Sequence, residues 1–325
     1  MRFATFETRE GVERLGLLTS QGQLADLQGA FASRLCLQIP PEKACDLAAV
    51  LAPPEIVAFL DGGDVCLEAA RQALAFVEEM LADGKTPVGP AQEKILFEPA
   101  EVSLKAPIPR PRKIICAGKN FLDHVQEMSS RGNTPQIPVA FPKVPSVVMS
   151  PEGRIPYPVE TAMLDYEVEM AIIIGKRGWK IRKEQAFDHV FGYTVFNDIS
   201  ARDMVRAENQ QGIFLLGKNL PGFAPMGPYL CSRDEIEDPQ SLRLQCRVNG
   251  QIRQDSNLGM MMFKIDEMIA YWSQVGLEPG DILTTGTPTG VAAGRSADKD
   301  PWWLKKGDIV EAEVETIGIL RTYIA

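Results

Sequence analysis

The segment Ala106-Pro-Ile-Pro-Arg-Pro-Arg112 carries a proline at every second position. Proline lacks a backbone N–H and disfavours helical geometry in the residue before it, so this segment cannot be helical and is expected to be an extended connector. We therefore place a domain boundary here, between a small N-terminal domain (residues 1–108) and a larger domain (residues 109–325). A chain of 325 residues is long enough for two such unequal domains.

The N-terminal part mixes strand and helix patterns. Short β-like runs cover residues 2–6 and 14–18, and Gly22 suggests a turn after the second run. Helical patterns follow at about 41–51, 54–59 and 67–83, the last with apolar residues at near 3.6 spacing. These patterns predict a small α/β domain.

Beyond the connector, β-branched runs bounded by Gly, Pro and Asp predominate. The runs are KIICAG, EVEMAIIIG, VFGYTVFNDI, LRLQCRVNG, DILTTG and DIVEAEVETIGILRTYI. Helical periodicity is confined to short pieces such as 260–275. Strands do not alternate regularly with helices, which disfavours a doubly wound parallel sheet. The fold class predicted for the chain is α+β and β-rich.

Charge and cysteine content limit the partners and the compartment. The formal charge of −9 gives the chain no general attraction to nucleic acids or anionic lipids, so both roles are disfavoured. No stretch approaches the length of an apolar membrane span, and the start lacks the apolar core of a signal peptide. The six scattered cysteines include no CxxC pair and are expected to be reduced thiols. We expect a cytoplasmic protein.

The most informative local sequence is Leu164-Asp-Tyr-Glu-Val-Glu-Met-Ala-Ile-Ile-Ile-Gly175. In a strand, Glu167 and Glu169 would point to the same face of the sheet. Two buried carboxylates repel each other and lose solvation, and a divalent cation is the simplest compensation. Ligands that are all oxygen favour Mg²⁺, Ca²⁺ or Mn²⁺ over zinc. Taken alone, the pair could equally be a solvated strand face.

A third acid, Asp198, ends the apolar run Gly192-Tyr-Thr-Val-Phe-Asn-Asp198, where a strand would present it at a sheet margin. The competing interpretation is a helix N-cap before Ser200 and Ala201. Only the combination of Asp198 with the two glutamates favours a metal site.

Two histidines exist, His124 and His189. Glu127 lies three positions after His124, so in a helix the two side chains share a face. A carboxylate beside an imidazole raises its basicity and fixes its orientation, as a general base requires. A surface histidine with an incidental neighbour is the alternative. His189 is interpreted as structural.

Two glycine-bearing segments and one polar segment complete the candidates. Leu216-Gly-Lys218 precedes a proline-containing stretch, and residues 284–290 (TTGTPTG) resemble a tight loop with free backbone donors. The loop lacks the Lys-Ser/Thr ending of a phosphate-binding loop, which argues against nucleotide binding. The polar stretch 128–136 is either a surface loop or a lid over bound substrate.

Together these residues resemble the fumarylacetoacetate hydrolase family, and in particular its acylpyruvase and fumarylpyruvate hydrolase members. The matching stretches run in the family's order and cover nearly everything after residue 112: Lys113-Ile-Ile-Cys-Ala-Gly-Lys-Asn-Phe-Leu-Asp-His124, Asp165-Tyr-Glu-Val-Glu169, 192–203 (GYTVFNDISARD), Gly217-Lys218, 223–228 (FAPMGP), 280–291 (GDILTTGTPTGV) and 306–311 (KGDIVE). The chain departs from the family at Phe121, often a tyrosine, at Met204 and Val205, and at 219–222 (NLPG). These departures leave the acyl group of the substrate open.

The resemblance implies a fold and a site. The second domain would be a rolled mixed β-sheet, commonly assembled as a homodimer. Glu167, Glu169 and Asp198 would bind the metal, with Mg²⁺ first and Mn²⁺ or Ca²⁺ as alternatives. His124 and Glu127 would activate water. Lys218 would face the reacting carbonyl, and Arg202 and Thr287 would contact substrate.

Our sequence-based hypothesis is metal-assisted hydrolysis of a C–C bond in a small 2,4-dioxo acid of the acylpyruvate type. His124, oriented by Glu127, would remove a proton from water, and Lys218 would stabilise the alkoxide that results. Three alternatives use the same site: decarboxylation of oxaloacetate or another β-keto acid, hydration, and isomerisation. A binding protein without catalysis is the remaining alternative.

Overall fold

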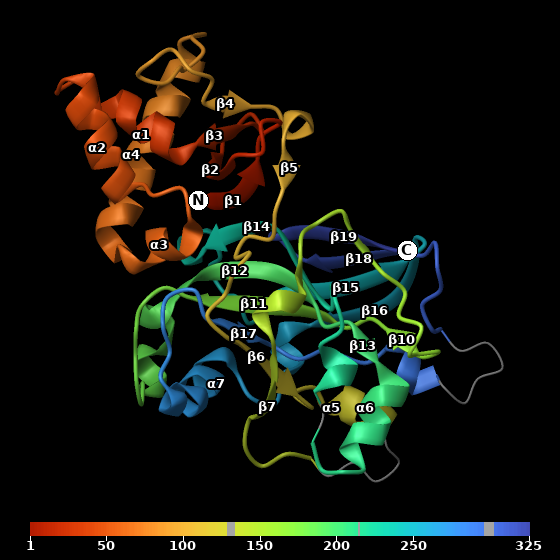
Figure 1. The fold of residues 1–325 in the computed structure, drawn as a ribbon. Helices are drawn as coiled ribbons and strands as arrows, with labels where there is room; N and C mark the ends of the chain where they lie inside the picture. The colour runs from red at the N-terminus through yellow and green to blue at the C-terminus, as the bar shows by residue number, and fades with distance from the viewer. Residues whose placement is uncertain (129–133, 214, 296–301) are drawn as a thin grey trace.

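The computed structural model describes residues 1–128, 134–213, 215–295 and 302–325 of the chain. Helices α1–α4 form a separate group at one end of the molecule, and the remaining helices lie around the sheets at the other end (Figure 1). The predicted α+β, β-rich class is confirmed, and the main sheet is mixed. Within the described residues, no helix combines the length and the apolar character that crossing a bilayer requires.

The N-terminal part contains five strands and four helices. Its strands are β1 (Arg2–Glu7), β2 (Glu13–Leu18), β3 (Leu24–Asp26), β4 (Leu96–Phe97) and β5 (Ser103–Leu104). Its helices are α1 (Leu27–Leu35), α2 (Pro41–Leu51), α3 (Ile56–Asp61) and α4 (Gly63–Ala82). The helical patterns at 41–51, 54–59 and 67–83 correspond to α2, α3 and α4, whereas sequence analysis missed α1.

These N-terminal strands do not form a sheet of their own. The main sheet has 12 strands in the order β4-β3-β2-β1-β14-β12-β11-β17-β6-β7, with β5 on β1 and β8 on β14. β1 pairs antiparallel with β14, through Arg2 opposite Cys231 and Phe3 opposite Leu230. The hydrogen-bonded sheet therefore runs across the proposed boundary, and the division at residue 108 stays a proposal about folding units.

The second part supplies the rest of the main sheet. Its strands there are β6 (Ile114–Gly118), β7 (Val139–Lys143), β8 (Val148–Met149), β11 (Val168–Ile174), β12 (Val190–Asn197), β14 (Ala224–Ser232) and β17 (Ile282–Thr284). β11 lies between β12 and β17 and all seven of its residues are buried, as its apolar run at 170–174 predicts. Val168 pairs with Asn197, which brings the start of β11 beside the end of β12.

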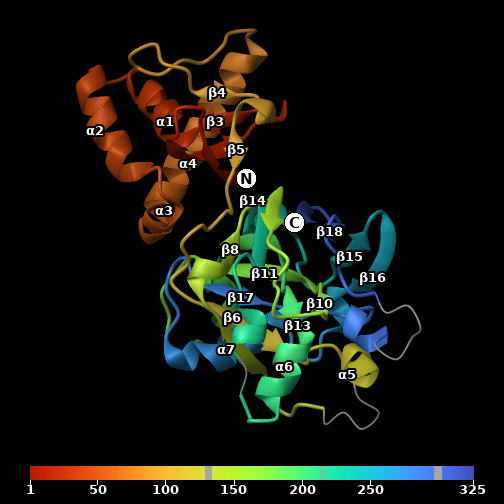
Figure 2. The same ribbon diagram turned by 45° about the vertical axis from the view of Figure 1, so that its right-hand side comes forward.

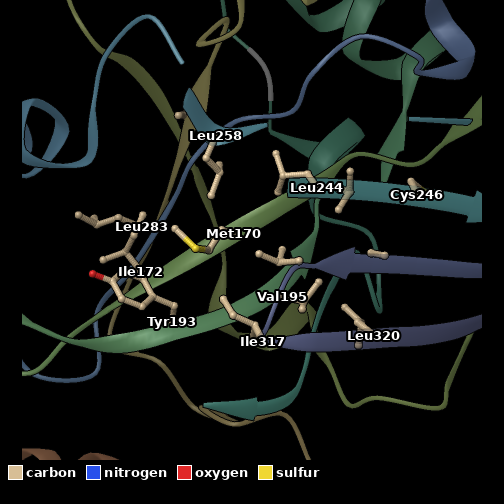
Figure 3. Close-up of a cluster of buried hydrophobic side chains, with 14 of the residues drawn as sticks. Met170, Ile172, Tyr193, Val195, Leu244, Cys246, Leu258, Leu283, Ile317 and Leu320 are labelled. Carbon is tan, nitrogen blue, oxygen red and sulfur yellow. The ribbon is translucent and has the colours of Figure 1, made fainter. Parts of the chain in front are cut away.

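A smaller sheet packs against this one. Its order is β16-β15-β18-β19-β9, and its strands are β9 (Gly153–Ile155), β15 (Arg243–Val248), β16 (Gln251–Asn257), β18 (Ile309–Val314) and β19 (Gly318–Ile324). Figure 3 shows Leu244 and Leu320 of this sheet facing Met170 and Val195 of the main sheet. The largest hydrophobic cluster fills the space between the two sheets.

Short helices surround the far end of the sheets. They are α5 (Leu122–Met128), α6 (Arg202–Asn209) and α7 (Ile265–Trp272), and a two-stranded ladder joins β10 (Leu164–Asp165) to β13 (Ser200–Ala201). Both ribbon views place α5 and α6 on the side away from α1–α4 (Figures 1 and 2). The helical pattern at 260–275 corresponds to α7 flanked by short 3-10 turns.

Strand β14 was not predicted. It contains Pro225 and Pro228, and proline is rare inside a strand because it has no backbone N–H to donate. The ladder between β12 and β14 is irregular between Tyr193 and Val195, close to these prolines. Pro228 falls within this interruption, so it costs no ladder hydrogen bond to β12, whereas Pro225 lies beyond it, opposite Met149 of β8.

Candidate metal centre and active site

Three acidic side chains that are distant in the sequence converge at the end of β11. One carboxylate oxygen from each of Glu167, Glu169 and Asp198 lies within 4.8 Å of the others, and all three residues are buried. Glu167 and Glu169 flank the first residue of β11, and Asp198 follows β12 directly. The N–H of Asp198 donates to the carbonyl of Glu167 at 2.9 Å, which fixes the two segments together.

Glu167 is the best-neutralised member of the cluster. Its Oε1 accepts from the guanidinium of Arg202, and its Oε2 accepts from Nζ of Lys218 at 2.6 Å. Burial alone would raise the pKa of Glu167, but the charges of Arg202 and Lys218 outweigh burial and lower it below the ordinary value. Glu167 is therefore ionised.

Glu169 has the opposite environment. Its side chain is buried, and Oε2 accepts from the N–H of Gly286 at 3.0 Å. Among the residues that the structure describes, no basic side chain lies within 4 Å of it. Burial raises its pKa well above the ordinary value, and the charges of Asp198 and Glu167 add to the effect.

The cluster fits a hard divalent cation. The buried carboxylates of Asp165, Glu167, Glu169 and Asp198 outnumber the cationic groups of Lys143, Arg202 and Lys218 by four to three. The excess negative charge falls on Glu169, where a cation would replace the missing counter-charge. All candidate ligand atoms are oxygens, as Mg²⁺, Mn²⁺ or Ca²⁺ require.

Asp198 does not cap a helix. The N-cap of α6 is Ala201, three residues later, so the competing interpretation of Asp198 is wrong. Its Oδ2 accepts from Nζ of Lys218 at 2.8 Å, and Nζ of Lys143 lies 2.7 Å from its Oδ1. Lys143 was missed by sequence analysis. It is almost fully buried, and its Nζ also donates to the carbonyls of Ile199, Lys218 and Phe223.

Lys218 lies between two carboxylates of the cluster rather than on the surface. Burial lowers its pKa, but the charges of Asp198 and Glu167 outweigh burial and raise it above the ordinary value, so the ammonium stays protonated. Its position depends on α6, because the carboxylate of Glu208 accepts from the N–H groups of residues 215–217. α6 thereby holds the turn that carries Lys218.

The two predicted substrate contacts are engaged within the protein. Nε of Arg202 donates to Asp165 at 2.8 Å, and its Nη2 donates to Glu167. The hydroxyl of Thr287 donates to the carbonyl of Val168 at 2.9 Å and accepts from Gln254 at 2.8 Å. Their roles as substrate contacts stay predictions, and both residues also support the acidic cluster.

His124 and Glu127 share one face of α5, as their spacing predicts. Nδ1 of His124 lies 3.5 Å from Oε2 of Glu127, and both side chains are largely buried. Burial raises the pKa of Glu127, but contacts with His124 and with the N–H of Gly290 outweigh burial, and the pKa lies below the ordinary value. A positive charge on His124 would help to lower the pKa of Glu167, so the imidazole lies within electrostatic range of the cluster.

Two further expectations concern residues near the dyad. His189 lies at the end of a 3-10 turn with Nδ1 2.9 Å from the carbonyl of Lys176, away from the cluster residues. The possible lid at 128–136 falls mostly on residues 129–133, which lie outside the described residues, so this hypothesis stays open. All six cysteines are described and are free thiols.

The chain is similar to known proteins along its whole length. Oxaloacetate tautomerase Fahd2a, mitochondrial, of Rattus norvegicus is 42% identical over 269 residues, which is 82% of this chain and 79% of that protein. Oxaloacetate tautomerase YisK of Bacillus subtilis (strain 168) is 38% identical over 328 residues and 100% of both chains. The structure of fumarylacetoacetate hydrolase from the psychrophilic Exiguobacterium antarcticum superposes with a TM-score of 0.74 at 30% identity, over 100% of this chain and 99% of that one. Residues 113–325 match the family model described as fumarylacetoacetate (FAA) hydrolase, C-terminal, and the chain therefore belongs to the fumarylacetoacetate hydrolase family.

Proposed function

We propose that this protein is a divalent-metal-dependent tautomerase that interconverts the keto and enol forms of oxaloacetate or a closely related 2-oxo dicarboxylic acid. The observation that carries the proposal is the 38% identity with an oxaloacetate tautomerase over the full length of both chains. The proposal favours the isomerase alternative of the sequence analysis over C–C bond hydrolysis. The acidic cluster and the charged Lys218 beside it suit a reaction through an enolate.

In this proposal Glu167, Glu169 and Asp198 hold Mg²⁺, with Mn²⁺ or Ca²⁺ as alternatives. When bound, the ion supplies Lewis acidity that favours the enolate form of a 2-oxo acid. Glu167 keeps its negative charge because Arg202 and Lys218 stabilise it. Glu169 is the carboxylate that gains most from the ion, because it has the least counter-charge without it.

The dyad moves the proton. In the ketonisation direction, the enol hydroxyl at C2 loses a proton and C3 gains one, so no proton is consumed and no water attack is needed. We assign both transfers to His124: the neutral imidazole accepts the hydroxyl proton, and the imidazolium then delivers that proton to C3, with Glu127 fixing the orientation of the ring. Lys218 cannot exchange protons readily because its pKa is raised, so it acts as a fixed positive charge beside the developing enolate.

Arg202 and Thr287 are the residues that we propose as substrate contacts. Arg202 can reach a substrate carboxylate only through Nη1, because its Nε and Nη2 bond to Asp165 and Glu167. The hydroxyl of Thr287 could donate to a substrate oxygen only by giving up its present bond to the carbonyl of Val168. We therefore assign to both residues a supporting role in addition to any contact with substrate.

Hydrolysis of an acylpyruvate-type C–C bond is the second candidate, because His124 and Glu127 could equally activate water. The full-length likeness to a fumarylacetoacetate hydrolase structure supports it. Decarboxylation of oxaloacetate differs from both, since it needs an enolate but no general base. We keep the homodimer and the cytoplasmic location as predictions, which light scattering and fractionation would test.

One substrate panel separates these activities. Purified protein is stripped with chelator, reloaded with Mg²⁺ or Mn²⁺, and supplied with oxaloacetate while the ultraviolet absorbance of the enol and the release of pyruvate are followed. Fumarylpyruvate, maleylpyruvate, acetylpyruvate and fumarylacetoacetate are tested in parallel for cleavage. The proposal expects metal-dependent loss of the enol without pyruvate release. Cleavage of a dioxo acid with no effect on the enol would replace it with the second candidate.

The variants His124→Gln and His189→Gln form a matched pair, because the chain has only these two histidines. His124→Gln should abolish most tautomerisation, whereas His189→Gln should retain it, since His189 contacts the carbonyl of Lys176 and not the cluster. Equal loss in both variants would mean that the effect comes from folding rather than from the dyad.

A further inference from the structure

The segment Gly290–Gly294 connects the acidic cluster to the His124–Glu127 dyad. It begins after the loop that carries Thr287 and includes the start of the 3-10 helix η8 (Ala292–Arg295), which packs against α5. On one side this segment bonds to residues immediately before β11, and on the other side it contacts Glu127.

Asp165 and Tyr166 fix the segment from the side of the cluster. The N–H groups of Ala292 and Ala293 donate to the carboxylate of Asp165 at 2.8 and 3.0 Å. The hydroxyl of Tyr166 donates to the carbonyl of Gly290 at 3.1 Å. Both side chains are buried.

Gly290 and Gly294 contact Glu127 from the opposite side of the same segment. The N–H of Gly290 donates to both carboxylate oxygens of Glu127, at 3.0 and 3.2 Å. A Cβ added to Gly294 would lie 2.2 Å from Cδ of Glu127 and 2.3 Å from its Cγ, so a glycine is needed for this close approach. Gly290 has a φ of +103°, a conformation that side chains rarely adopt.

We propose that Asp165 and Tyr166 are positioning residues, which hold Glu127 through Gly290–Gly294 and thereby set the orientation of His124 relative to the acidic cluster. The role follows from the order of contacts, because Tyr166 directly precedes Glu167 in the chain while its hydroxyl bonds to the residue that binds Glu127. α5 is only seven residues long and cannot by itself fix its distance from β11. The segment supplies that connection.

The proposal rests on the proposed function for its kinetic test, but the geometry has a readout of its own. The variant Tyr166→Phe removes one hydroxyl and keeps the ring in the core. The control is Tyr193→Phe, which removes a hydroxyl from another buried tyrosine of the same hydrophobic cluster, on β12 opposite Ile172. With only Cε1 of each imidazole labelled, the two histidines give two NMR signals, so His189 serves as an internal reference for His124.

We expect Tyr166→Phe to shift the His124 signal and leave the His189 signal in place. With Mn²⁺ and oxaloacetate, kcat should fall about five-fold, as expected for one lost positioning hydrogen bond, while KM changes less than two-fold. The affinity for Mn²⁺, measured by calorimetry, should stay within two-fold, because Glu167, Glu169 and Asp198 keep their partners. Tyr193→Phe should change none of these quantities.

Gly294→Ala tests the same contact from the other side, since the added methyl group meets Glu127 and leaves Tyr166 intact. It should shift the His124 signal at least as far as Tyr166→Phe and lower kcat further. An unshifted His124 signal in both folded variants would overturn the proposal. So would a loss of Mn²⁺ affinity equal to the loss of kcat, because the residues would then be merely structural. If wild-type protein fails to tautomerise oxaloacetate, the proposed function falls, while the NMR comparison still decides whether the segment positions the dyad.

Discussion

Replacing Glu169 with Gln should stabilise the metal-free protein against unfolding and should nearly abolish the stabilisation that a divalent metal ion provides. Glu169 lies within 4.8 Å of two other carboxylates, and two unit charges at that distance repel by about 3.5 kcal/mol at an effective dielectric constant of 20. The two neighbours together would cost about 7 kcal/mol, partly offset by Lys218. The destabilisation of the folded state cannot exceed about 3.4 kcal/mol at pH 7, because Glu169 takes up a proton once the repulsion costs more than that. This value is the free energy of protonating a carboxyl whose ordinary pKa is 4.5 at pH 7. Glutamine avoids that cost and can still accept from Gly286.

The expected shift in melting temperature follows from the size of the chain. An unfolding entropy of about 2.1 cal/mol/K per residue gives about 0.7 kcal/mol/K for 325 residues, so 3.4 kcal/mol corresponds to at most about 5 °C. Mn²⁺ at about 100 times its Kd should stabilise the wild type by about 2.7 kcal/mol, or about 4 °C, and should leave Glu169→Gln nearly unchanged. The variant should therefore melt higher in chelator, and the gap should nearly close in Mn²⁺.

The assay is differential scanning fluorimetry in EDTA and in saturating Mn²⁺, with Glu237→Gln as a control at an exposed glutamate. The difference in melting temperature between Glu169→Gln and the wild type in EDTA should also increase with pH. Because the pKa of Glu169 is raised in the folded state, the folded protein binds more protons than the unfolded chain above pH 4.5, and its stability falls as pH rises through the raised pKa. A variant that melts below the wild type in EDTA, or that gains as much from Mn²⁺, would refute the reasoning.

Three further predictions concern the same site. The affinity for Mn²⁺ should rise as the pH rises through the raised pKa of Glu169, because a proton on Glu169 competes with the ion. Calorimetry in buffers of different ionisation enthalpy should detect the proton that is released on binding. An affinity that does not depend on pH would contradict this prediction. Lys218→Met should lower kcat by about 100- to 1,000-fold through loss of charge beside the enolate, and near-normal turnover of the folded variant would remove Lys218 from the mechanism. His124→Gln should lower kcat by about 100- to 10,000-fold with Mn²⁺ affinity retained, and loss of metal binding instead would assign His124 to the ion.

The sequence predicted those helices and strands whose local residue pattern matches their burial in the folded protein. α2 has exactly the predicted bounds, with a proline in its first turn, and β11 follows from an apolar run too uniform for an exposed strand. The convergence of the acids was predictable because Glu167 and Glu169 alternate along a strand and Asp198 ends another apolar run. The pairing of Val168 with Asn197 then brings these ends together.

What sequence analysis missed depends on long-range partners. Lys143 is the last residue of β7 and has no local sign of function, and its role comes from Asp198 and three carbonyls contributed by distant segments. The pairing of β1 with β14 was hidden because the prolines of β14 disguise an internal strand. Likewise, nothing near Arg202 in the sequence indicates that Asp165 and Glu167 already occupy its guanidinium.

The central claim is that Glu167, Glu169 and Asp198 hold one hard divalent cation beside His124. Anomalous diffraction from crystals grown with Mn²⁺ tests it most directly. The account predicts one strong peak, with an oxygen of each carboxylate at about 2.0–2.3 Å and with Lys218 and His124 close by. A peak elsewhere, or no peak at saturating Mn²⁺, would contradict it.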